Sequence, residues 1–387
     1  MKLAERMSRL GTETAFEVLA KAKALEAQGK EIIHLEIGEP DFATPKNICE
    51  SAKKAIDDGV THYGPSAGLP EARKVIAKYI SETRKIPVDP EEVVITPGAK
   101  PIIFFPILAL VNEGDEVIYP NPGFPIYESM INFVGGVAKP VPLREEKNFS
   151  VDVEEFRSLF TPRTRLVIIN TPSNPTGGVI PEENLKKMAE IIKEYDCMVL
   201  SDEVYDRMIY EGVHHSIASF PGMKERTIIL NGFSKTYAMT GWRLGYGVMP
   251  KELAGHITRL QTNSNSCTCS FTQIAGIEAL EGPQAESESM VEKFRERRDI
   301  IVEGLNSLDG ITCHKPSASF YVFPNIKKLG MKSSEVEKFL LEEAGVAALS
   351  GTSFGKFGEG YIRFSYANSI PNIKRAIEKI KSALEKL

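Results

Sequence analysis

Five short apolar runs stand out along the chain, and none of them alternates with polar residues. They occupy positions 93–95, 117–119, 166–169, 198–200 and 228–230. Amphipathic stretches with helical spacing, such as 185–195, separate them. Strands that are apolar at every residue and alternate with helices are typical of a parallel sheet covered on both faces. The pattern therefore predicts an α/β unit with a mostly parallel central sheet.

A polar or glycine-rich cluster follows each apolar run. The clusters occupy positions 96–100, 120–124, 170–174, 201–203 and 231–235. In parallel α/β sheets, ligands bind beyond the carboxyl ends of the strands. We therefore expect the five clusters to meet at one binding site.

The pattern changes near Gly282, where a charged helix is expected. Its apolar residues share one side: Met290, Phe294, Ile301 and Leu305. Apolar strands are expected at 318–323 and 361–365, and the final helix has apolar positions at Ile373, Ile377, Ile380 and Leu384. An early helix carries Val18, Ala22 and Leu25 and closes near Gly29. We predict a large domain at 46–283, a smaller α+β domain at 284–387, and an N-terminal segment, 1–45, associated with the small domain.

Composition narrows the class of partner. The 387 residues are 42% hydrophobic and 26% charged, with a net charge of −5 and no basic run. A chain without a positive surface is not expected to bind nucleic acid, which leaves small molecules as the expected partners. The longest apolar run, 102–111, is interrupted by Pro106 and is about half as long as a membrane span.

The N-terminal residues and the cysteines predict a cytoplasmic protein. The first ten residues include Glu5 among basic residues and lack the apolar core of a signal peptide. Five cysteines without a CxxC pair predict reduced thiols rather than a disulfide framework. Cys267 and Cys269 lack neighbouring His or Cys ligands, so no metal site is predicted.

Lys235 is the strongest candidate for a reactive group. It lies in the stretch NGFSKTYAMTGWRLGY, positions 231–246, directly after an apolar run and eight residues before Arg243. A lysine that is desolvated, or held near a second positive charge, has a pKa below its usual value of about 10.4. Its neutral amine is then a nucleophile toward carbonyl groups and can form a Schiff base. The alternative is an ordinary solvated lysine.

Other polar residues near the strand ends are also candidates. Asp202 and Tyr205 follow one predicted strand, so both side chains can enter one cleft; the alternative for Asp202 is a helix cap. Asn174 lies in the turn SNPTG, whose Pro and Gly fix the backbone. Arg363 interrupts an apolar strand and needs an anionic partner, which is either a bound carboxylate or an internal salt bridge.

Positions 96–101 predict an anion site. Gly98 follows a strand, and Pro101 stands where the next helix would begin. Free backbone N–H groups and the positive end of the helix dipole would then face the ligand. The segment is neither a P-loop nor a GxGxxG motif, so a nucleotide is not favoured.

Four motifs occur in succession along the chain: SNPTG, DEVY, SKTYAMTGWRLGY and YIRFSYA. With these motifs, and with IGEPDF at 37–42, the chain resembles the class I pyridoxal 5′-phosphate (PLP) aminotransferases of fold type I, the aspartate aminotransferase family. The resemblance extends from position 37 to the last helix. It implies a large PLP-binding domain with a mostly parallel sheet, a smaller α+β domain, and a homodimer with shared active sites.

The resemblance also implies roles around the cofactor ring. Lys235 would bind PLP covalently and, once released, carry the proton during catalysis. Asp202 would pair with the ring nitrogen and keep it protonated. Tyr205 and Asn174 would hydrogen-bond the ring oxygen, and Phe124 would stack on the ring face.

Phosphate and substrate contacts follow from the same resemblance. The phosphate ligands within the chain would be Gly98, Ala99, Lys100, Ser234 and Arg243. Tyr63 would reach the phosphate of the neighbouring subunit. Arg363, with Gly38 and Asn174, would bind the α-carboxylate of the substrate.

Two departures from the family pattern bear on the substrate. Gly232 stands where many relatives have a serine that contacts the phosphate. The stretch 261–270 contains no arginine, whereas some aspartate aminotransferases use one there to bind the distal carboxylate. Lys100 is the possible substitute, as in similar bacterial and archaeal enzymes, although Ala15 replaces the threonine that assists it there, with Thr14 adjacent.

The resulting hypothesis is a ping-pong aminotransferase that uses 2-oxoglutarate as acceptor and aspartate as the best single donor. An aromatic or alanine aminotransferase is the nearest alternative. A PLP β-lyase remains open because substrate orientation, rather than the shared residues, decides the reaction outcome. A non-enzymatic regulator is disfavoured because Lys235 is intact.

Overall fold

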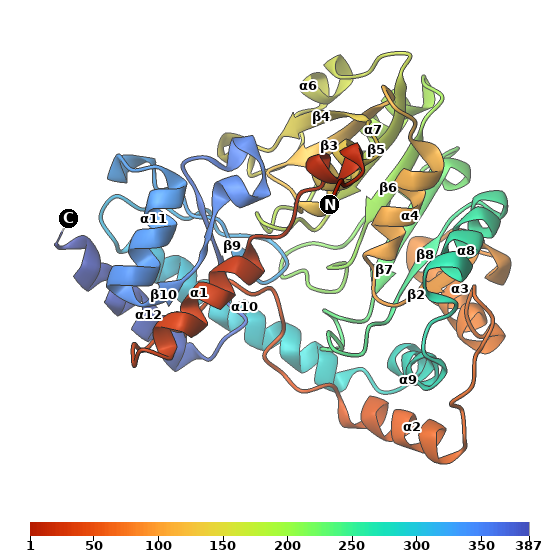
Figure 1. Ribbon diagram of the computed structural model, residues 1–387, viewed down its shortest axis with the longest axis horizontal. Coiled ribbons are helices and arrows are strands. Elements are labelled where there is room, and N and C mark those ends of the chain that lie inside the picture. Colours follow the sequence, from red (N-terminus) through yellow and green to blue (C-terminus); the bar gives the residue numbers. More distant parts are fainter. Residues whose placement is uncertain (387) are drawn as a thin grey trace.

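The fold is built around a seven-stranded sheet, as a computed structural model of residues 1–386 shows (Figure 1). The spatial order is β2-β8-β7-β6-β5-β3-β4, and every neighbouring pair is parallel except those that involve β8. The strands are β2 (Val93–Thr96), β3 (Glu116–Asn121), β4 (Val137–Pro142), β5 (Thr164–Asn170), β6 (Met198–Asp202), β7 (Thr227–Gly232) and β8 (Gly245–Val248). The predicted α/β class with a mostly parallel sheet is confirmed, and the five apolar runs are β2, β3, β5, β6 and β7.

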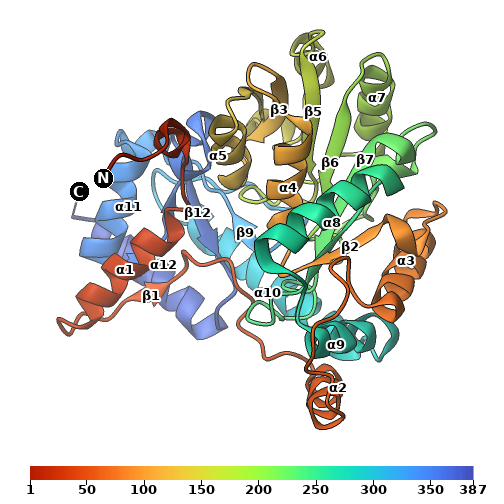
Figure 2. The ribbon, with the colours of Figure 1, turned by 45° about the vertical axis from the view of Figure 1, so that its right-hand side comes forward.

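Helices cover both faces of this sheet, which explains why its central strands are apolar at every position. On β5, Leu166 and Ile168 pack with α4, α5 and α8, whereas Val167 and Ile169 pack with α6 and α7. Figure 2 shows α4 and α8 lying across one face of the sheet. The helices of this part are α2 (Lys46–Asp57), α3 (Pro70–Arg84), α4 (Pro101–Leu110), α5 (Ile126–Phe133), α6 (Val153–Ser158), α7 (Glu182–Lys193), α8 (Lys251–Asn265) and α9 (Ser270–Glu281).

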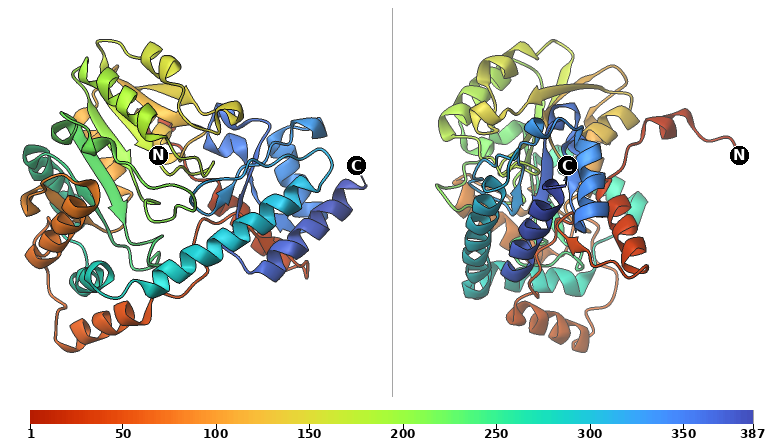
Figure 3. Two further views of the ribbon diagram at one scale, coloured as in Figure 1. Left: turned by 180° about the vertical axis from the view of Figure 1, so that it is seen from behind. Right: turned by 90° about the vertical axis from the view of Figure 1, so that its left-hand side faces the viewer.

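The C-terminal elements form a second core beside the sheet (Figure 1). Helix α1 lies next to them, but its buried residues, Val18 and Ala22, belong to a cluster that Ala347 and Leu349 share with the sheet part. The long helix α10 runs from the sheet part into this second part (Figure 3, left). Strand β1 pairs with β10, and β12 lies between β11 and β9. The elements are α1 (Ala15–Glu26), β1 (Ile33–His34), α10 (Ala285–Asn306), β9 (Tyr321–Val322), α11 (Ser333–Phe339), β10 (Val346–Ala347), β11 (Leu349–Ser350), β12 (Ile362–Ser365) and α12 (Ile370–Leu384).

The predicted helices of this part are confirmed, but one predicted strand is shorter than expected. The apolar side of α10 and that of α12 are buried against each other and the small sheets. The expected strand at 318–323 is reduced to β9, because Ser319 has a left-handed φ of 62° and Ala318 instead bridges to Ile209. The domain boundaries stay predictions, although α10 begins at Ala285, close to the predicted boundary at 283/284. No helix within residues 1–386 is long and apolar enough to cross a membrane.

Candidate active site

Lys235 lies just beyond the carboxyl end of β7, as the sequence predicts. Its ammonium donates a hydrogen bond to the carbonyl oxygen of Gly38 and lies 5.6 Å from the ring centroid of Phe320. Burial lowers the pKa of Lys235 to about 8, and the positive charge of Arg363 adds to that effect. The environment of a reactive lysine is therefore present, and the proposed covalent role stays a prediction.

Asp202 ends β6 and is 5% exposed. Its carboxylate accepts hydrogen bonds from the phenol of Tyr127, at 2.5 Å, and from the backbone N–H of Val204, at 3.3 Å. Burial raises the pKa of Asp202 to about 6, against the lowering effect of the Tyr127 hydrogen bond. Within residues 1–386 it forms no ion pair, and the next helical segment begins only at Ile217. The helix-cap interpretation is therefore wrong, and the buried carboxylate suits a cationic ligand group.

Arg363 lies on β12 and is 4% exposed. It donates to the amide oxygen of Asn174, at 3.1 Å, and to the carbonyl oxygen of Glu36. Its buried Nε has no hydrogen-bond partner, and no carboxylate within residues 1–386 pairs with it. The internal salt bridge considered from the sequence is thus absent there, and the unsatisfied guanidinium fits a bound anion.

Tyr321 connects the two ends of this group. Its hydroxyl lies 2.9 Å from that of Tyr205, and its ring lies 4.5 Å from the guanidinium carbon of Arg363. A Cβ added to Gly38 would lie 2.1 Å from the Tyr321 hydroxyl oxygen. Only glycine fits at position 38, and its carbonyl can therefore approach the Lys235 ammonium.

The predicted anion site lies at the start of α4. Gly98 has a left-handed φ of 84°, and a Cβ there would lie 2.2 Å from a guanidinium nitrogen of Arg243. Arg243 is exposed and donates to the carbonyl oxygen of Thr240 at 2.7 Å. Ala99 and Ser234 are half-buried. A guanidinium, the backbone around Gly98 and a helix N-terminus thus converge, which is the donor set that a phosphate requires.

Gly232 closes β7 next to this cradle. A Cβ at this position would lie 3.3 Å from the carbonyl oxygen of Leu244 and 3.6 Å from the Cβ of Ala99. Gly232 supplies no side-chain hydroxyl at this position. The role of the neighbouring residues in binding a phosphate stays a prediction.

Lys100 and Phe124 border the site on the side of α4. The Lys100 ammonium lies 5.7 Å from the Phe124 ring centroid and forms an ion pair with Glu13. Phe124 also packs edge to face on Tyr127, with ring centroids 5.8 Å apart. Tyr63 is 92% exposed and lies outside this group within the chain. A contact of Tyr63 with the phosphate of a neighbouring subunit stays a prediction.

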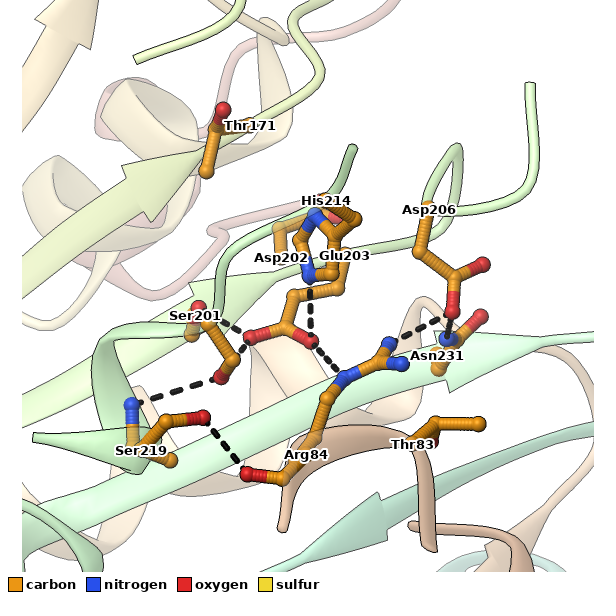
Figure 4. A network of polar contacts seen from close by, with 12 residues as sticks. Thr83, Arg84, Thr171, Ser201, Asp202, Glu203, Asp206, His214, Ser219 and Asn231 are labelled. Atoms are coloured by element: carbon orange, nitrogen blue, oxygen red, sulfur yellow. Dashed lines mark hydrogen bonds and ion pairs between the residues drawn. The ribbon is translucent and has the colours of Figure 1, made fainter. Parts of the chain in front are cut away.

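A buried charge network lies next to Asp202 (Figure 4). Arg84, at the end of α3, donates to Glu203 at 2.8 Å and to Asp206 at 2.5 Å. Glu203 also contacts His214 at 2.9 Å, and Asp206 accepts from Asn231 at 3.0 Å. Arg84 and His214 hold the pKa of Glu203 at about 2, despite its burial. The network ties α3 and the end of β7 to the segment that carries Asp202 and Tyr205.

Sequence reasoning missed Tyr127, Tyr321, Glu13 and Arg84. Tyr127 lies three residues after Phe124, at the start of α5, and its closeness to Phe124 in the sequence is the one signal that could have indicated it. The other three reach the site from distant parts of the chain. Nothing in their local sequence distinguishes them from core or surface residues.

Comparison with known proteins is consistent with this geometry. Residues 30–380 match the family described as Aminotransferase class I and II. An aspartate aminotransferase of Pyrococcus horikoshii is 41% identical, over 99% of this chain and 97% of its own. The aromatic-amino-acid aminotransferase 2 of Thermococcus litoralis is 38% identical, over 100% and 99%. The structure of a Thermus thermophilus aspartate aminotransferase with maleate superposes with a TM-score of 0.94, at 37% identity over 99% of this chain and 100% of that one.

The chain therefore belongs to the class I and II aminotransferase family, and the family membership predicted from the sequence motifs is confirmed. It is an enzyme of the transaminase class, as the sequence motifs indicated.

Proposed function

We propose that this aminotransferase uses PLP and transfers the amino group of an L-amino acid to 2-oxoglutarate by a ping-pong reaction. The convergence of Lys235, Asp202 and Arg363 carries the proposal. A desolvated amine, a buried unpaired carboxylate and a guanidinium with a free Nε each lack the partner that PLP or an amino acid would supply.

The residues present fit PLP. Arg243, Ser234 and the backbone of positions 98–100 would hold the phosphate, and Phe124 would lie against the ring. Tyr205 and Asn174 would hydrogen-bond the ring oxygen. Bound PLP supplies an aldehyde that accepts the amino group and a ring that accepts electrons from the substrate.

Three side chains then hold the ring proton, transfer the substrate proton and orient the substrate. The Asp202 carboxylate holds a proton on the ring nitrogen. With a pKa of about 8, the Lys235 amine has an appreciable neutral fraction at neutral pH and can take the proton from the substrate Cα. Arg363 binds the α-carboxylate through its guanidinium fork, with Gly38 and Asn174, and thereby orients the Cα–H bond.

The functional unit in this proposal is a cytoplasmic homodimer. The exposure of Tyr63 supports it, because a large aromatic side chain that is 92% exposed in one chain is suited to contact a second subunit. Tyr63 would complete the phosphate site of that subunit.

Aspartate is the best single donor in this proposal, with Lys100 binding the distal carboxylate. The position of Lys100 beside Phe124, the residue proposed to lie against the cofactor ring, supports this assignment. The similarity to an aromatic aminotransferase favours aromatic amino acids as the second candidate class.

A panel of amino donors with 2-oxoglutarate tests the proposal. We expect glutamate to form from aspartate at the highest kcat/KM. Highest activity with phenylalanine or alanine would replace aspartate as donor and leave the reaction class intact. Release of pyruvate and ammonia from cysteine conjugates without an acceptor, and no glutamate from any donor, would contradict transamination.

A further inference from the structure

The N-terminal strap, defined here as residues 5–14, reaches the site through Glu13, which contacts Lys100. It comes from the part of the chain that extends outward from the body (Figure 3, right). Side-chain hydrogen bonds tie it down through Arg9 to Asn132 at 2.9 Å, Gly11 to Ser129 at 3.0 Å, and Thr14 to Ser353 at 2.7 Å. The strap therefore connects α5 of the sheet part to the segment that follows β11.

Glu13 is the one acidic side chain of the strap that faces the site. Its side chain is 18% exposed and forms an ion pair with Lys100, whose side chain is 49% exposed. The Glu13 charge also acts to raise the pKa of both Lys235 and Arg363, although burial outweighs it at each. The Glu13 carboxylate thus interacts with three cations, Lys100, Lys235 and Arg363, that are proposed to bind the cofactor or the anionic groups of the substrate.

A ping-pong aminotransferase binds donor and acceptor in the same pocket. If 2-oxoglutarate is the acceptor, the pocket must receive a distal carboxylate in one half-reaction. A neutral donor in the other half-reaction places an apolar group beside the same lysine. An apolar group there would take solvent away from the ammonium, and a counter-charge that can be exchanged offsets part of that loss.

We propose that Glu13 is a specificity-determining residue whose carboxylate occupies Lys100 until the distal carboxylate of a dicarboxylic substrate replaces it. This inference rests on the proposed function. Neutral substrates bind with the Glu13–Lys100 pair closed, and the pair shields them from the ammonium. Dicarboxylic substrates must open the pair. Their apparent affinity is therefore the intrinsic affinity multiplied by the fraction of molecules in which Lys100 is free.

Binding of two unreactive acids to the PLP-loaded enzyme tests the role of Glu13. Maleate represents dicarboxylates and 3-phenylpropionate represents neutral side chains, and calorimetry measures both dissociation constants. Because an ion pair of this exposure contributes about 1 kcal/mol, Glu13→Gln should bind maleate about fivefold more tightly. It should bind 3-phenylpropionate about twofold more weakly, since Lys100 is then unpaired. Unchanged or weaker maleate binding would overturn the proposal.

A matched control and a double variant separate this mechanism from a general charge effect. Glu17→Gln removes the same charge from an exposed position four residues along the chain and should leave both affinities unchanged. In a Lys100→Ala background, Glu13→Gln should improve maleate binding less than in the parent. An equal gain in both backgrounds, or the same gain from Glu17→Gln, would show that Glu13 does not act through Lys100.

The wild-type enzyme distinguishes failure of this inference from failure of the proposed function. If it binds neither acid, the proposed substrate site is wrong and the role of Glu13 falls with it. If it binds both acids and Glu13→Gln leaves the maleate constant unchanged, only the role of Glu13 is overturned.

Discussion

The Asp202 carboxylate should destabilise the cofactor-free protein at neutral pH. Burial raises its pKa from the ordinary 3.8 to about 6, and no ion pair within the described residues compensates its charge. Between these values the folded protein binds more protons than the unfolded chain does. Stability therefore falls as the pH rises through this window.

The size of this effect follows from the two pKa values. Their difference, 6 minus 3.8, is about two pKa units, and each unit corresponds to about 1.4 kcal/mol. The ionised Asp202 should thus cost about 3 kcal/mol of unfolding free energy at pH 7. Asp202→Asn keeps an oxygen that can accept the Tyr127 hydrogen bond but does not ionise. The cofactor-free variant should therefore be more stable than the parent at pH 7, and about equally stable near pH 4.

Thermal unfolding of the two cofactor-free proteins between pH 4 and pH 8 measures this difference. Subtracting the parent from the variant removes the contributions of the other titrating groups. Asp57→Asn, which makes the same change at an exposed position, is the control and should show no pH-dependent difference. A variant that is less stable than the parent at pH 7, or a difference that does not change with pH, would refute the assigned electrostatics.

Addition of PLP should reverse the order of stability. A protonated ring nitrogen is the cation that Asp202 lacks, so PLP should raise the melting temperature of the parent more than that of Asp202→Asn. The variant should also lose transamination by several powers of ten, because the ring nitrogen is no longer held protonated. Activity within about tenfold of the parent would remove Asp202 from the catalytic group.

Three other substitutions test residues that support or line the site. Arg84→Met removes the guanidinium that pairs with both Glu203 and Asp206 and should lower the unfolding free energy by about 3 to 5 kcal/mol, as measured by denaturant titration. Tyr127→Phe removes a hydrogen bond that lowers the pKa of Asp202, so in the cofactor-free protein the loss of stability assigned to Asp202 should extend to higher pH; an unchanged pH window would contradict this. Arg363→Lys should raise KM about a hundredfold for every donor in steady-state assays; an effect on acidic donors alone would contradict α-carboxylate binding.

The sheet was predictable where both of its faces are buried. Such strands read as continuous apolar runs, as β5 and β7 do. The edge strand β4 escaped detection because it is half-exposed and contains Lys139 and two prolines. Strand β8 was not predicted because its sequence, GYGV, is not a continuous apolar run. Its glycines allow close packing, since a Cβ on Gly245 would lie 2.5 Å from Gly98 and Ala99.

The candidate site was predictable where the chemistry is local in sequence. Lys235 and Asp202 follow directly from strand ends, and Arg363 is conspicuous on an apolar strand. Tyr321 and Glu13 could not be found in this way, because their partners lie more than eighty residues away. Their contacts depend on how the sheet part and the C-terminal part meet, which a pattern of apolar residues does not encode.

The central claim is that Lys235 is the residue that binds PLP. Reduction of the purified enzyme with borohydride, followed by proteolysis and mass spectrometry, locates the attached cofactor directly. We predict one phosphopyridoxyl group per chain on the peptide that contains Lys235, and none in Lys235→Ala. A label on Lys100 or any other lysine, or its persistence in Lys235→Ala, would contradict the account.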